Sequence, residues 1–125
     1  MGEVCLIDTG APVSMGAPDI LCAELGRRVD RVLGMDELGK EAVLLDWPGR
    51  TVTFGYVADG SAAADVIPAR KRSGLYQIEV ATPMGSHWAF LDTGAPLSYA
   101  SAQACAGLTS IGARGDFHPG VGTFT

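Results

Sequence analysis

Short apolar runs, broken by glycine, proline and aspartate, follow one another along the chain, and most have the length of a strand. The run 3–7 is rich in β-formers and leads into an Asp-Thr-Gly turn, which predicts a buried strand that ends there. Apolar residues recur at helical spacing within 17–26, so we expect a short helix with Gly26 as its C-cap. Residues 31–40 then predict a short strand closed by Gly34 and one helical turn.

The clearest β pattern is a pair of hairpins. Two β-rich runs within 42–57 flank Pro48 and Gly49, the pair that a type II turn prefers at its central positions. A second hairpin is expected over 75–91, and the small, polar, proline-broken stretch 58–73 between the two predicts a linker. These patterns predict an all-β fold with one or two short helices.

The strongest signal in the sequence is a repeat. The segment Asp-Thr-Gly-Ala-Pro-x-Ser occurs at 8–14 and again at 92–98, each time directly after an apolar run. A repeat within one chain indicates the architecture before any single residue does. We therefore expect two short lobes related by a pseudo-twofold axis, one over 1–57 and the other over 74–125, joined by the linker.

Composition and charge limit which binding partners and which cellular compartment we expect. The 125 residues are 47% hydrophobic and carry a formal net charge of −5, so we expect a globular chain that does not bind nucleic acid, which requires a basic face. Three scattered cysteines (Cys5, Cys22 and Cys105) predict reduced thiols and no zinc site. The sequence shows no signal-peptide pattern and no apolar run of about eighteen residues, so a cytoplasmic protein without a membrane partner is expected.

The repeat places two carboxyl groups at equivalent positions. Asp8 and Asp92 follow equivalent strands, so their side chains can meet across the axis. Like charges about 3 Å apart cannot both ionise cheaply, so such a pair holds one shared proton and titrates as a unit. The ionised member can accept a proton from water while the protonated member polarises a carbonyl group. This is general acid–base hydrolysis without a metal or cofactor.

The residues around the aspartates fit this task. The glycines leave room for a substrate backbone, the threonine hydroxyls can hydrogen-bond across the axis, and the serines can support the carboxyl groups from behind. The supporting candidates are Thr9, Gly10, Ala11 and Ser14 in the first copy, and Thr93, Gly94, Ala95 and Ser98 in the second.

Two apolar-apolar-Asp-Thr-Gly-Ala segments resemble those of the aspartic peptidases, and alanine in the fourth position is closer to the retropepsin-like branch than to the pepsins. The segments 32–38 and 42–54 are similar to the closing part of a retropepsin-like lobe. The resemblance implies an acid-protease fold, catalytic Asp8 and Asp92, and peptides or unfolded proteins as substrates. It also implies a β-hairpin flap that closes over the substrate. The flap candidates in the glycine-rich tail are Phe117, His118, Gly120 and Gly122.

The chain departs from the family pattern in both lobes. Gly34 follows Asp8 by only 26 positions, which leaves no room for a flap in the first lobe. The second lobe has a flap candidate after Asp92 but no closing segment. A miniaturised two-lobe enzyme, a piece of a longer chain, and a permuted unit in which 74–125 and 17–57 rebuild one lobe all fit this pattern. A monomeric pseudo-dimer and a homodimer are both compatible with it.

Two other interpretations use the same residues. Actin-like sugar kinases also carry two such aspartate loops, but their fold needs long helices and favours Gly or Thr where this chain has Ala-Pro. The stronger alternative is an inactive relative that binds extended peptides as an added strand or associates with itself, because aspartate before Thr-Gly is also a good turn residue. Contact between the carboxyl groups of Asp8 and Asp92 distinguishes a dyad from two structural turns.

Overall fold

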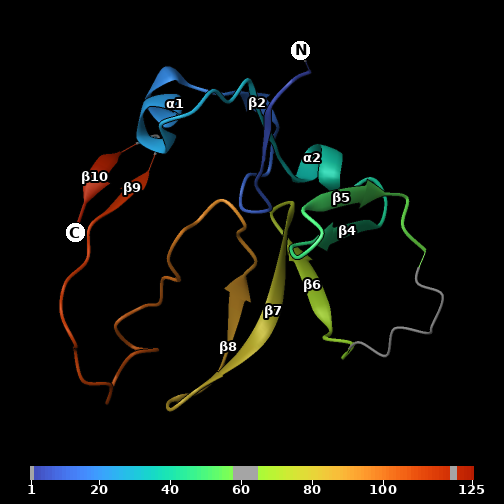
Figure 1. The fold of residues 1–125 in the computed structure, drawn as a ribbon. Helices are drawn as coiled ribbons and strands as arrows, with labels where there is room; N and C mark the ends of the chain where they lie inside the picture. Colours follow the sequence, from blue (N-terminus) through green and yellow to red (C-terminus); the bar gives the residue numbers. More distant parts are fainter. Residues whose placement is uncertain (1, 58–64, 119–120) are drawn as a thin grey trace.

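The computed structural model describes residues 2–57, 65–118 and 121–125, which form mostly strands with two short helices (Figure 1). The first half contains β1 (Cys5–Ile7), β2 (Met15–Gly16), α1 (Asp19–Leu25), β3 (Arg31–Leu33), α2 (Met35–Leu38), β4 (Val43–Asp46) and β5 (Thr51–Phe54). The second half contains β6 (Ala69–Arg72), β7 (Leu75–Thr82), β8 (Gly85–Phe90), β9 (Asp116–His118) and β10 (Gly122–Phe124). The all-β class predicted from the sequence is therefore confirmed. Neither helix of the described chain has the length and apolar character needed to cross a membrane.

A three-stranded mixed sheet organises the first half, with β3 in the middle. β1 runs parallel to β3, with Leu6 opposite Val32, and β2 runs antiparallel to it, with Met15 opposite Val32. α1 connects β2 to β3 and ends at Gly26, whose φ of 61° is a left-handed conformation that glycine adopts at little cost. The expected C-cap is thus present. The sheet brings the end of β1, and with it the first aspartate loop, against β3.

The apolar core is small and lies almost wholly in the first half. The buried apolar residues of the described chain are Ala11, Leu21, Val29, Val32, Met35, Leu38 and Ala104. Phe117 of β9 packs against the cluster formed by three of them, Ala11, Leu21 and Val32. The antiparallel pair β9–β10 therefore lies beside α1, although it comes from the far end of the chain (Figure 1).

The first predicted hairpin is present, but its turn is not type II. β4 and β5 pair antiparallel, with Asp46 opposite Thr51. Gly49 lacks the positive φ that a type II turn requires, and Arg50 adopts a φ of 53° instead. The reason is local hydrogen bonding, because the N–H of Gly49 donates to Asp46 Oδ1 (2.9 Å) and the N–H of Arg50 donates to the carbonyl of Trp47 (3.2 Å). These bonds fit a right-handed turn followed by one left-handed residue.

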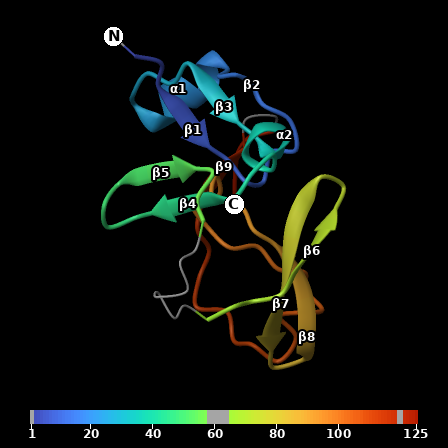
Figure 2. The same ribbon diagram turned by 90° about the vertical axis from the view of Figure 1, so that its right-hand side faces the viewer.

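The second predicted hairpin, β7–β8, gains a third strand from the expected linker. β6 pairs antiparallel with β7, so residues 69–72 belong to a sheet of order β6-β7-β8, which lies apart from α1 and β1–β3 (Figure 2). Side chains on neighbouring strands hold β6 in place. Arg70 Nε donates to Oε1 of the buried Gln77 (2.9 Å), and its guanidinium lies 3.9 Å from the ring centroid of Trp88. The part of the linker over 58–64 lies outside the described residues.

Candidate active site

The two aspartate loops repeat one conformation. Asp8 Oδ1 accepts hydrogen bonds from the backbone N–H groups of Gly10 and Ala11, at 2.9 and 3.1 Å. Asp92 Oδ1 accepts the equivalent bonds from the residues two and three positions later, also at 2.9 and 3.1 Å. The repeat in the sequence is therefore a repeat in structure, and each loop holds its own carboxyl group with backbone donors.

The carboxyl groups of Asp8 and Asp92 face each other across the two loops, close enough for their charges and side chains to interact. The glycines of the two loops make this approach possible. A Cβ atom on Gly10 would lie 2.5 Å from both carboxylate oxygens of Asp92, and a Cβ on Gly94 would lie 2.7 and 2.8 Å from those of Asp8. A larger residue at either position would push the pair, called the dyad below, apart.

Thr9 and Thr93 cross between the loops and join them. The N–H of Thr9 donates to Thr93 Oγ1 (3.1 Å), and the N–H of Thr93 donates to Thr9 Oγ1 (3.0 Å). Each hydroxyl group then donates to the strand end of the other copy, Thr9 to the carbonyl of Leu91 (2.8 Å) and Thr93 to that of Ile7 (2.7 Å). This threonine crossing, four hydrogen bonds between distant parts of the chain, contains the cross-axis contacts expected from the sequence.

Burial raises the pKa of Asp8 above its ordinary value, because an ion is less stable away from water. The negative charge of Asp92 and the hydrogen bond with its side chain raise this pKa further, against the opposing effect of the N–H groups of Gly10 and Ala11. Asp92 is the more exposed of the two residues. Asp8 is therefore the natural holder of a proton shared by the dyad.

The serines do not support the carboxyl groups as expected. Ser14 donates from its N–H and its hydroxyl group to Asp36 Oδ1, at 2.8 and 2.6 Å, and its Oγ accepts from the N–H of Gly34 at 2.9 Å. Ser98 is exposed and makes no side-chain hydrogen bond within the described part of the chain. The backbone donors of each loop already hold Oδ1 of its aspartate, so Ser14 instead links the first loop to the segment 34–36.

This segment clamps the first loop from behind. The N–H of Met35 donates to the carbonyl of Ala11 (2.8 Å), and that of Asp36 donates to the carbonyl of Pro12 (3.2 Å). The hydrogen bond from the hydroxyl group of Ser14 is the main reason that the pKa of Asp36 lies below its ordinary value. The sequence interpretation missed Asp36, although its position two residues after Gly34 in the closing segment was a usable signal.

The dyad opens into a cavity of about 710 Å³. Residues from the loops, from α1 and from the C-terminal hairpin line it, among them Ala95, Pro96, Tyr99, Phe117, His118 and Phe124. Of the flap candidates, Phe117 and His118 thus lie in its wall, Gly122 begins β10 with a φ of 88°, and Gly120 lies outside the described residues. No three His, Cys, Asp or Glu side chains within the described ranges are arranged to hold a metal ion.

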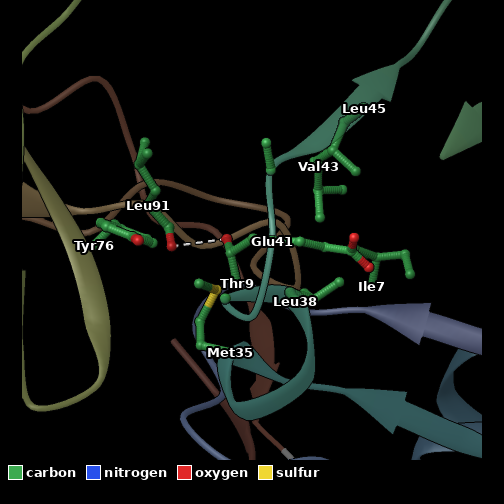
Figure 3. Close-up of a pocket in the computed structure, with 11 residues that line it drawn as sticks. Ile7, Thr9, Met35, Leu38, Glu41, Val43, Leu45, Tyr76 and Leu91 are labelled. Carbon is green, nitrogen blue, oxygen red and sulfur yellow. Dashed lines mark hydrogen bonds between the residues drawn. The ribbon is translucent and has the colours of Figure 1, made fainter. Parts of the chain in front are cut away.

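A second cavity, of about 260 Å³, lies behind the threonine crossing (Figure 3). Its lining is mostly apolar, with Met35 and Leu38 from α2 on one side and Tyr76 and Leu91 from the second half on the other. The hydrogen bond from Thr9 to Leu91 borders it (Figure 3). A cavity rather than closely packed side chains therefore lies on this side of the threonine crossing.

Comparisons of the chain with protein-family models, with curated proteins and with solved structures each found no match. The comparisons therefore assign the chain to no family. The functional argument depends on the geometry of the dyad, the threonine crossing and the cavity into which they open.

Proposed function

We propose that this chain is an aspartic endopeptidase of the retropepsin-like type, which uses Asp8 and Asp92 to activate water for hydrolysis of peptide bonds. The observation that carries the proposal is the close approach of the two carboxyl groups, held by loops of one conformation. Two purely structural turns have no reason to bring aspartates from distant parts of a chain into contact in a cavity. A pair that shares a proton requires this contact.

In the proposed reaction, an extended peptide lies in the cavity with a water molecule between its carbonyl group and the dyad. Asp92 takes a proton from the water, whose oxygen attacks the carbonyl carbon, while Asp8 donates its proton to the carbonyl oxygen. The tetrahedral intermediate then collapses. The C–N bond breaks as Asp92 gives its proton to the leaving amine and Asp8 takes a proton from a hydroxyl group of the intermediate, which becomes the new carboxyl group. The dyad is then singly protonated again.

Cleavage of an unfolded protein at acidic pH tests this proposal. The Asp92→Asn variant cannot take the proton from water, so we expect its rate to fall by about 10²- to 10⁴-fold. Asp65→Asn is a matched control, because it makes the same chemical change at an exposed residue outside the cavity. Equal cleavage by the wild-type chain and by Asp92→Asn would contradict the proposal.

A second candidate function is peptide binding without cleavage. The observation that favours it is the difference between the two loops, because the segment 34–36 clamps the first loop while Ser98 of the second is exposed. A second loop without this clamp would leave the cavity able to bind an extended peptide but less able to align water. Binding of a labelled peptide with no product detected by mass spectrometry would favour this function.

A further inference from the structure

The walls of the cavity that contains the dyad are mainly apolar. Leu21 and Leu25 of α1 line it, and Phe117 of β9 packs against the cluster that contains Leu21. Tyr99 and Phe124 also line the cavity, with their ring centroids 6.1 Å apart. Walls of this kind accept large apolar side chains.

The charged side chains that line the cavity, among the described residues, are all acidic. Besides the dyad they are Glu24 on α1 and Asp116 on β9, and the other titratable groups in the lining are Tyr99 and His118. No lysine or arginine of the described chain contributes to the lining. Carboxyl groups gathered around one cavity with apolar walls produce a negative potential inside it. This potential attracts basic ligands and repels acidic ones.

Asp116 offers a specific contact for a cation. Its Oδ1 accepts a hydrogen bond from the N–H of Phe117 at 2.7 Å, whereas its Oδ2 is buried and has no hydrogen-bond partner in the structure. Asp116 as a whole is only partly buried and lines the cavity, so a cation in the cavity can pair with its negative charge. The cationic N–H groups of lysine and arginine are the strongest donors that a peptide carries.

We propose that the cavity selects basic peptides, in which a large apolar residue at the cleaved bond is accompanied nearby by a lysine or arginine that binds Asp116. The apolar side chain packs on the wall formed by α1 and Phe117, and the cation pairs with the carboxylate of Asp116. Glu24 adds attraction from α1. The inference rests on the proposed function in one respect, namely that the cavity receives an extended peptide.

Binding of matched peptides tests the charge preference without requiring cleavage. Three fluorescein-labelled peptides share a central Leu-Phe pair whose peptide bond is N-methylated, so that it resists hydrolysis. They carry lysine, glutamine or glutamate two positions before and two positions after the pair. Anisotropy titrations at low ionic strength should give a Kd about tenfold lower for the lysine peptide than for the glutamine peptide, and the weakest binding for the glutamate peptide. Equal affinities would overturn the inference.

Variants of the chain test the role of Asp116. Asp116→Asn keeps the shape and removes the charge, so the preference for lysine should fall from about tenfold to less than about twofold. Asp65→Asn, outside the cavity, should keep the full preference. A preference that Asp116→Asn leaves unchanged would overturn the assignment to Asp116. If this variant does not fold by circular dichroism, the peptide series on the wild-type chain still decides the charge preference.

The same peptides with an ordinary central bond separate this inference from the proposed function. A preference for lysine in binding, with no cleavage of any peptide, would uphold the inference and contradict the endopeptidase proposal. Equal cleavage of the lysine and glutamine peptides, abolished in Asp92→Asn, would overturn the inference and support the endopeptidase proposal.

Discussion

The side chain of Thr93 shows how much the site depends on single atoms. Its Oγ1 accepts from the N–H of Thr9 and donates to the carbonyl of Ile7, across the boundary between the two halves. Thr93→Val keeps the shape and leaves both partners without a hydrogen bond, so we expect the free energy of unfolding to fall by about 1–3 kcal/mol. Because the dyad loses alignment, kcat/KM should also fall, by about tenfold or more. Thr93→Ser keeps the hydroxyl group, so it should retain most of the free energy of unfolding and most of kcat/KM. Urea unfolding and peptide hydrolysis measure the two effects, and a valine variant that matches the wild-type chain would contradict the role of the crossing.

The direction of the Asp8 pKa shift determines the sign of a pH effect on stability. Its pKa in the folded chain lies above the ordinary value of 3.8, so the contribution of Asp8 is fully present below that value and is lost as pH rises through the raised pKa. Asp8→Asn imitates the protonated form at every pH. The difference in Tm between this variant and the wild-type chain should therefore be more positive at pH 7 than at pH 3.5. Thermal unfolding followed by circular dichroism measures it. A Tm difference that does not change with pH would contradict the raised pKa. Catalysis should be lost over the same rise in pH, because it needs the shared proton.

At the scale of the elements, the sequence predicted what depends on local pattern. α1 and its C-cap Gly26 follow from helical spacing and the tolerance of glycine for positive φ, and both hairpins follow from β-rich runs around turns. The strand β6 was missed because it depends on contacts with other strands, above all those of Arg70 with Gln77 and Trp88.

The residues of the site also divide into those that the sequence pattern predicted and those whose contacts depend on the fold. The dyad and the threonine crossing were predictable because both aspartates and both threonines belong to the repeat. Asp36 and Asp116 have no counterpart in the repeat, and their roles arise only when β3 and β9 come against the first loop and its cluster. The expected role of Ser14 was wrong for the same reason, since its partners are set by the fold and not by its place in the motif.

The clamp formed by 34–36 gives a prediction with an internal control, because Ser14 and Ser98 hold the same place in the repeat. Ser14→Ala removes the acceptor of the buried Gly34 N–H, so we expect a loss of about 1–3 kcal/mol in the free energy of unfolding at pH 7. Ser98→Ala should change it by less than about 0.5 kcal/mol. The hydrogen bond from Ser14 lowers the pKa of Asp36, and the resulting stability is present above 3.8 and is lost as pH falls through the lowered pKa. The loss caused by Ser14→Ala should therefore shrink in acid, and equal losses in the two serine variants would contradict the clamp.

At the scale of the whole molecule, the chain exposes more surface than a monomer of its size normally does. Its accessible surface is 9187 Å² for a mass of 12.9 kDa, whereas a folded monomer of this mass exposes about 6,300 Å². The excess is far larger than the roughly 800 Å² that each partner buries in a standard interface. Part of it lies on the second half, where Trp88, Phe90 and Leu91 are 41%, 48% and 43% exposed. The second half therefore has apolar surface without cover, and it contributes only Ala104 to the buried apolar residues of the described chain.

The strand β8 is the place where a second copy can supply that cover. In the described chain β8 pairs with β7 alone and has one open edge. Its counterpart β1 is also an edge strand, beside β3, but the residues of β1 are half-buried whereas most of those in β8 are exposed. Because an open apolar edge is a template for pairing with another chain, we expect the wild-type chain to associate with itself at micromolar concentration. Sedimentation velocity from about 1 to 50 µM should show a shift to the mass of a dimer or larger. Phe90→Glu should abolish this shift, because it places charge beside the edge, and Val57→Glu, on a residue that is 83% exposed after β5, should not. A single species of 12.9 kDa across the whole range would contradict self-association through this edge.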